Sequence, residues 1–395
     1  MSVTDSICDS NAPSSSAVRL TARSVYLQTA QYSIVILTIV RLLFVSCVTC
    51  LNTWKRVCCA RATPRPPGEI AISSQELLYL SRADVENVAL DMRTIINLLE
   101  AAFKEKGQGR VEMPPKPGIH TQPDAFIHAM PAYIPSLRSA GLKWVSGYPE
   151  NMKRNLPYIT GLLILNDVET GVPYAVMDCT WITAYRTGAA SALSARYLAR
   201  PDSEVAGILA CGVQGRTNLE ALATLFPIKR VYAYDIVPTV QQHYIDEMKA
   251  RLGLDVIGVQ EPRKAVVESD LVVTSGPILK HPTPTIEKDW LRPGAFASAV
   301  DFDSYWTPGA LAQFDKLSTD DHAQFQYYRS AGYFQSTPDP YADLSEIVAG
   351  LKLGRERSDE RTMAMNLGLA LDDMAVAPEI YRRAKERGIG TWLPL

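Results

Sequence analysis

Cysteine is scarce in most of the chain, because beyond residue 59 only Cys179 and Cys211 remain among 395 residues. So few thiols exclude a disulfide-built body and are typical of a reducing compartment. Metal-site spacing is lacking as well: the histidines form no H-x-x-x-H pattern, and none accompanies the cysteine pairs near residues 50 and 58. The sequence therefore predicts no metal.

Blocks of lysine and arginine are also lacking, and the formal net charge is -2. No stacked-aromatic pattern of a nucleic-acid module accompanies them, so no nucleic-acid partner is expected. The composition is that of an ordinary globular protein, and the length permits two domains with separate cores.

Acidic residues are missing between residues 10 and 68, a stretch that holds seven arginines and lysines. Within it, the apolar run 33–51 has about the length that crosses a bilayer, roughly 20 residues. Arg41 stands near its middle, where a charge is costly. A membrane anchor within residues 1–60, a mitochondrial targeting peptide and an extension outside the enzyme all remain open, with a cytoplasmic location as the expectation. The linker "TPRPPG" ends this N-terminal extension, residues 1–68.

The next part of the chain mixes helical and strand patterns. Apolar residues recur at helical spacing after Asp91, which is suited to cap the helix. Extended segments follow in "AFIHAMPAYI" and "GLKWVSGYP", and residues 161–178 read as a hairpin. A helix rich in small residues comes next, within "WITAYRTGAASALSARYLA", and it permits close approach of another backbone.

After Pro201, apolar strands alternate with helices, including "EVAGILAC", "RVYAYD", "DLVVTSG" and "AFASAVDF". This alternation predicts a parallel sheet with right-handed crossovers, that is, a Rossmann-type domain over residues 199–361. A helical pattern at the C-terminus could return to the first domain. The predicted fold class is therefore α/β, with the Rossmann-type domain inserted in a discontinuous α+β domain, residues 69–198 plus 362–395.

The stretch "ILACGVQGRTNLEAL" joins a strand to a helix through a glycine turn. The three positions of a G-x-G-x-x-G fingerprint hold Ala210, Gly212 and Gly215, so the motif by itself is weak. Asp235 ends the next strand, about 20 residues later, where a carboxylate binds the adenine ribose and repels a 2′-phosphate. NAD(H) is therefore favoured and NADP(H) is the alternative, as is a purely structural turn. The residues expected to hold the dinucleotide here are Gly212, Val213, Gln214, Gly215 and Asp235.

From about residue 75 to the C-terminus the sequence resembles the ornithine cyclodeaminase/mu-crystallin family. The resemblance is carried by "MPPKPGIH", "AMPAY", "GLKWVSGYPEN", "GLLILNDVETGVPYAVMD", "TAYRTGAASALSARYLA", "CGVQGRTNLEAL" and "NLGLALDDMAVA". It implies a homodimer in which a substrate-binding and dimerisation domain stands beside the Rossmann domain. Members include ornithine cyclodeaminases, ketimine reductases, amino-acid dehydrogenases and a lens crystallin that binds a hormone.

The resemblance also implies a clamp for the substrate carboxylate. The family's basic positions map onto Lys143 in "GLKWV" and Arg186 in "AYRTG". A third position, usually arginine, is Lys116 in "PPKPG", which preserves the charge but not the planar fork. Without the resemblance, each of the three would read as a solvated or structural cation.

In the cyclodeaminases the catalytic aspartate lies after the last Rossmann strand, in a segment resembling "AVGGD". Here "AVDFD" aligns Asp303 with it, and Asp301 and Phe302 replace two glycines. Asp301 is either a second substrate-binding acid or a strand-end cap. In "TSGP", Thr274 and Ser275 match the family's loop at the dinucleotide.

The expected activity is hydride transfer between a nicotinamide cofactor and the α-carbon of an amino or imino acid, as in a ketimine reductase or amino-acid dehydrogenase. Lys143 and Asp303 are the expected catalytic residues. One alternative is an ornithine cyclodeaminase, which forms proline and ammonia. Another is a non-catalytic binding protein like the crystallin.

Overall fold

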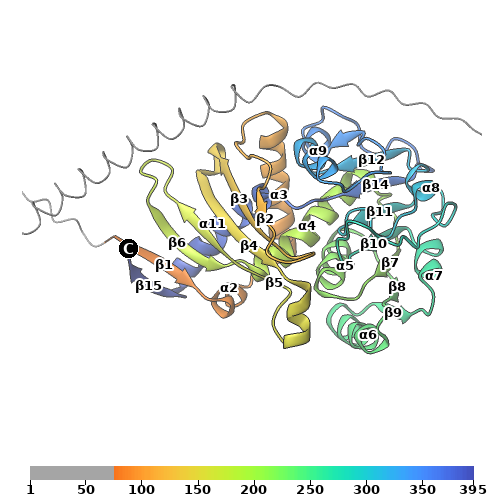
Figure 1. The fold of residues 1–395 in the computed structure, drawn as a ribbon, viewed down its shortest axis with the longest axis horizontal. Coiled ribbons are helices and arrows are strands. Elements are labelled where there is room, and N and C mark those ends of the chain that lie inside the picture. The colour runs from red at the N-terminus through yellow and green to blue at the C-terminus, as the bar shows by residue number, and fades with distance from the viewer. Residues whose placement is uncertain (1–74) are drawn as a thin grey trace, which may run out of the picture. The chain divides into compact units, whose positions relative to one another are not determined.

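The computed structural model describes residues 75–395 (Figure 1). The expectations for the N-terminal extension lie outside these residues. No helix within 75–395 has both the length and the apolar character needed to span a bilayer.

Among the described residues, the first sheet has seven strands in the order β15-β1-β6-β5-β4-β3-β2. Apart from the parallel pair β1·β6, its neighbours are antiparallel. The expected hairpin is confirmed as β5 and β6, whereas β15 was not expected. The bounds are β1 (Glu76–Leu80), β2 (Gly118–Ile119), β3 (Phe126–Ile134), β4 (Ser139–Gly147), β5 (Ile159–Asn166), β6 (Pro173–Asp178) and β15 (Thr391–Pro394).

The second sheet, also counted over residues 75–395, has eight strands in the order β13-β12-β14-β11-β10-β7-β8-β9, and every neighbouring pair is parallel. The order reverses between β7 and β10, as in a doubly wound fold, so the predicted fold class is confirmed. The bounds are β7 (Val205–Leu209), β8 (Arg230–Tyr234), β9 (Asp255–Gly258), β10 (Leu271–Thr274), β11 (Phe296–Ala299), β12 (Lys316–Thr319), β13 (Ala342–Asp343) and β14 (Thr362–Met365).

One expected boundary needs a correction. Residues 362–365 were assigned to the first domain, but they form β14, which pairs on both sides inside the second sheet. All four residues of β14 are buried, as a central parallel strand requires. The chain therefore leaves the Rossmann sheet only after Met365.

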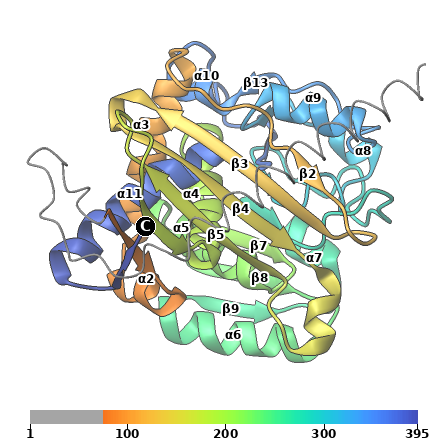
Figure 2. The ribbon, with the colours of Figure 1, turned by 60° about the vertical axis from the view of Figure 1, so that its left-hand side comes forward.

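The helices cover both sheets (Figures 1 and 2). Asp91 caps α3 by accepting the Thr94 backbone N–H, as expected. The helices are α2 (Arg82–Val88), α3 (Met92–Gly107), α4 (Thr180–Leu198), α5 (Val213–Leu225), α6 (Pro238–Leu252), α7 (Pro262–Val267), α8 (Pro308–Leu311), α9 (His322–Ser330), α10 (Leu344–Val348) and α11 (Ala370–Arg387), with 3-10 turns η2 (Pro135–Leu137) and η3 (Pro149–Arg154).

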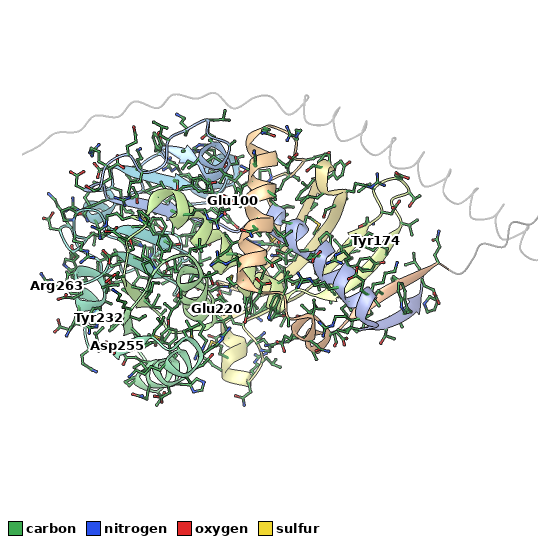
Figure 3. All side chains as sticks on the ribbon, turned by 180° about the vertical axis from the view of Figure 1, so that it is seen from behind. Glu100, Tyr174, Glu220, Tyr232, Asp255 and Arg263 are labelled. Carbon is green, nitrogen blue, oxygen red and sulfur yellow. The ribbon has the colours of Figure 1, made fainter. Side chains whose placement is uncertain are left out.

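The helix α4 joins the two halves, because it contacts α3 and α11 on one side and α5, β11 and β14 on the other. Its small residues allow this. A Cβ at Gly188 would lie 2.5 Å from the carbonyl oxygen of Thr217 in α5. Toward α3, the Tyr197 hydroxyl of α4 donates to Glu100 at 2.6 Å; Glu100 is labelled in Figure 3. The helix α4 is thus packed closely against both α3 and α5.

Candidate functional site

Lys143 and Arg186 meet two acids at the start of α11. Lys143, on β4, places its Nζ 2.6 Å from Asp373 Oδ2, and neither side chain is exposed. Arg186, on α4, has Nη1 3.3 Å from Asp372 Oδ2 and Nε 3.5 Å from Asp373 Oδ1. Three elements thus bring these charges into a site closed to water.

Lys116 joins the same cluster from the loop before β2. Its ammonium donates to the carbonyl oxygens of Leu367 at 2.6 Å and Gly368 at 2.9 Å. It also lies 5.4 Å from the ring centroid of Tyr328. Lys116 is 8% exposed, so the interpretation as a solvated loop lysine does not fit.

The turn before α11 holds the cluster together. Gly368 has a φ of +77°, and a Cβ there would lie 2.6 Å from Nη1 of Arg186, so only glycine fits. Its N–H donates to Asp320 Oδ2 at 2.8 Å. A single peptide segment therefore touches Lys116, Arg186 and Asp320.

Three acids that surround these cations were not expected from the sequence. Asp372 and Asp373 lie in "LALDDMAVA", and Asp320 follows the buried strand β12. Two adjacent acids within an otherwise apolar helical stretch indicate a buried polar site, because a buried carboxylate needs a cation or hydrogen-bond donors. We name the set of Lys116, Lys143, Arg186, Asp320, Asp372 and Asp373 the buried charge cluster.

Burial dominates the protonation of the buried charge cluster. It lowers the pKa of Lys116 to about 7 and, with the Arg186 charge, lowers the pKa of Lys143. It raises the pKa of Asp320 to about 7 and that of Asp372 to about 6. Among residues 75–395, Asp320 Oδ1 and Asp372 Oδ1 are buried without a hydrogen-bond partner. Buried polar atoms without a partner are uncommon in folded proteins and are found at catalytic and binding sites among other places.

The glycine turn has the features expected of an anion site. Gly212 is the N-cap of α5, no side chain caps this helix, and a Cβ added to Gly212 would meet no atom within 4 Å. A Cβ at Gly215 would lie 2.5 Å from the Ala210 carbonyl oxygen, so this glycine permits tight packing of helix on strand. Ala210 takes the positive φ, +73°, of the glycine it replaces. Val213 is exposed and Gln214 half-buried at the first turn of the helix.

Two further expected residues border this turn. Asp235 accepts the backbone N–H groups of Cys211 and Val237, each at 2.8 Å, which hold its carboxylate beside the turn. The Ser275 hydroxyl donates to the carbonyl oxygen of Ala210 at 3.0 Å. Both side chains therefore lie where a nucleotide on the turn would be within reach.

The geometry does not support a direct dinucleotide contact for the Thr274 side chain. Its buried hydroxyl donates to Asp301 Oδ1 at 2.7 Å and accepts Trp306 Nε1–H at 3.2 Å. Asp301 also accepts the Gly276 N–H at 2.9 Å, and burial raises its pKa to about 7. Both carboxylate oxygens of Asp301 thus accept hydrogen bonds from the chain itself, as the strand-end cap alternative expects.

Asp303 stands apart from the buried charge cluster. Its Oδ2 accepts the Thr337 hydroxyl at 2.9 Å, and burial raises its pKa. No ion pair or hydrogen bond within residues 75–395 joins it to Lys116, Lys143 or Arg186. Phe302, which precedes Asp303 in the chain, has its ring centroid 5.0 Å from that of Tyr328.

Comparison with known proteins gives a consistent result. A model of the ornithine cyclodeaminase/mu-crystallin family matches residues 75–388. Alanine dehydrogenase of Archaeoglobus fulgidus is 34% identical over 327 residues, which are 80% of this chain and 98% of that protein.

Two solved structures share the fold over most of the chain. Delta(1)-pyrroline-2-carboxylate reductase of Thermococcus litoralis, in complex with NADH and L-proline, has a TM-score of 0.73 and 34% identity, covering 80% of this chain and 99% of that one. An archaeal alanine dehydrogenase dimer with bound NAD has a TM-score of 0.70 and 32% identity, again covering 80% and 99%.

Proposed function

The chain belongs to the ornithine cyclodeaminase/mu-crystallin family, and we propose that it is an NAD(H)-dependent oxidoreductase acting at the α-carbon of a small amino or imino acid. The observation that carries this proposal is the buried charge cluster. Three cations from three separate elements converge there on acids with unpartnered oxygens.

The cluster suits a carboxylate ligand. Burial raises the pKa of Asp320 and Asp372, which reduces the negative charge that a bound carboxylate would meet near neutral pH. The planar guanidinium of Arg186 matches a carboxylate, and Lys143 and Lys116 add point charges. Holding the α-carbon in place in this way lowers the activation free energy by several kcal/mol, and by up to about 7–11 kcal/mol in well-aligned cases.

The geometry of the glycine turn suits a dinucleotide. The uncapped amides of α5 and the open space above Gly212 favour a pyrophosphate, and the Asp235 carboxylate favours an unphosphorylated ribose. A bound NADH would supply the hydride that reduces a C=N bond to an amine. That bond also takes up one proton.

Two residues are proposed to deliver the proton that the reduced C=N bond takes up. The lowered pKa of Lys143 makes its ammonium a better acid near the reacting nitrogen than an exposed lysine. Asp303, with its raised pKa, would hold or pass a proton through water. Arg186 and Lys116 then act only on the carboxylate.

The test is absorbance of the nicotinamide band with the full chain. We expect NADH oxidation with pyrroline-2-carboxylate, or with pyruvate plus ammonia. Arg186→Met should raise the substrate KM strongly and leave NADH affinity unchanged, whereas the exposed Arg382→Met serves as a matched control. Tight ligand binding without turnover of any imino acid would instead favour the binding protein.

We also propose a homodimer formed through the outer face of the first sheet. Trp144 and Leu162 are register partners on β4 and β5, and each is 44% exposed. An exposed apolar pair on a sheet is typical of a covered face. Light scattering should give twice the chain mass, and Trp144→Glu should give the mass of one chain.

A further inference from the structure

Two phenylalanines adopt backbone conformations that phenylalanine avoids. Phe302 has a φ of +62° and Phe334 a φ of +56°. A bulky residue in the left-handed region is strained, and such strain persists where the surroundings enforce it, often at functional sites. A glycine at position 302 would carry no such strain.

The two strained residues pack against each other. Their ring centroids are 4.8 Å apart, and Phe302 also lies 5.0 Å from Tyr328 and 5.6 Å from Tyr333. Phe302 is 3% and Phe334 1% exposed. We call these four rings the aromatic cluster. The strained backbone therefore directs both phenylalanine rings into one buried group.

The aromatic cluster borders the buried charge cluster. Tyr328 has the Lys116 ammonium 5.4 Å from its ring centroid on one side and the Phe302 ring on the other. Phe302 follows β11, at the carboxyl edge of the parallel sheet, where dinucleotides bind in this fold. The rings of Tyr328 and then Phe302 thus follow the Lys116 ammonium in a continuous series of contacts.

We propose that the aromatic cluster, through Phe302, restricts the substrate to an α-imino or α-amino acid with a short, uncharged side chain. This inference rests on the proposed function. A long chain would have to displace buried rings. A distal ammonium would meet the Lys116 charge already facing Tyr328.

The test compares length profiles. The kcat/KM values are measured with NADH, ammonia and unbranched 2-oxo acids from pyruvate to 2-oxohexanoate. Wild type should favour the shortest acids. Phe302→Gly should shift the optimum to longer chains, with a gain of roughly tenfold or more for each methylene group admitted. Phe302→Leu retains bulk where the glycine variant fails to fold, and should shift the optimum less.

The control is Phe314→Leu, which alters a ring packed on Trp306, 5.5 Å away and outside the aromatic cluster. Calorimetric titration of the NADH-loaded variants with unreactive alkanoates, propionate to hexanoate, gives a second profile without turnover. A shift confined to the Phe302 variants supports the inference, and profiles that match the control overturn it. A shifted binding profile with no turnover in wild type would overturn the proposed function alone. Turnover with unshifted profiles would overturn the inference alone.

Discussion

Removing the Lys143 ammonium should expose the energetic character of the buried charge cluster. Lys143→Met leaves Asp373 fully buried, with Arg186 at 3.5 Å as its remaining cation. Breaking a buried ion pair from one side costs about 3–5 kcal/mol, because the other charge stays uncompensated. At about 2–4 °C per kcal/mol, the melting temperature should fall by roughly 6–20 °C.

The double variant Lys143→Met/Asp373→Leu should recover most of that loss, since two apolar side chains replace both charges. Urea unfolding, followed by tryptophan fluorescence, gives the free energies of unfolding of the wild type, the two single variants and the double variant. From this double-mutant cycle we expect a coupling free energy of about 2–3 kcal/mol. The recovered double variant should still lack turnover, which separates stability from function.

The matched control is Arg382→Met, in an exposed pair with Glu379, where the loss should stay below about 1 kcal/mol. If Lys143→Met destabilises no more than this control, or if the double variant loses the sum of the single losses, the two charges do not form a buried pair. The assignment of the cluster would then be wrong.

Three further outcomes are expected. Ala210→Gly removes the strain of the +73° φ and should raise the free energy of unfolding by about 0.5–1 kcal/mol. Gly212→Ala should change the free energy of unfolding by less than about 0.5 kcal/mol, yet it should weaken NADH binding, which fluorescence titration measures. Gly188→Ala forces a Cβ against the Thr217 carbonyl and should cost about 1–3 kcal/mol in urea unfolding; a smaller loss would mean that α4 and α5 separate freely. Lowering the pH from 8 to 6 protonates Lys116 and Asp320, whose pKa values are both about 7, and then Asp372, whose pKa is about 6. Because the cluster gains positive charge, the KM for the substrate carboxylate should fall. A KM that rises or does not change would contradict this expectation.

The sequence predicted much of the fold because its signals are local. The parallel sheet follows from apolar strands that alternate with helices, and the turn at Gly212 and Gly215 follows from glycine spacing. The C-terminal boundary was placed too early, because β14 is a four-residue strand whose assignment depends on partners far away in sequence.

The site was predictable only in part, for a similar reason. Lys116, Lys143 and Arg186 lie close together as expected, but the acids that contact them come from the turn after β12 and from α11, more than 130 residues after Arg186. The role of Asp301 as a cap depends on the Thr274 and Gly276 contacts, which spacing does not reveal. The positive φ of Phe302 has no local signal in the sequence, apart from the glycine that stands at this position in the "AVGGD" segment it resembles.

The most direct test of the proposed function follows the hydride itself. NADH carrying deuterium at the nicotinamide C4 is incubated with the full chain and a short α-imino acid, and the amino acid product is analysed by mass spectrometry and NMR. We predict one deuterium at the α-carbon of the product, with no product from Arg186→Met at the same substrate concentration. Product without label at the α-carbon, or no product from any imino acid while NADH binds, would contradict the account.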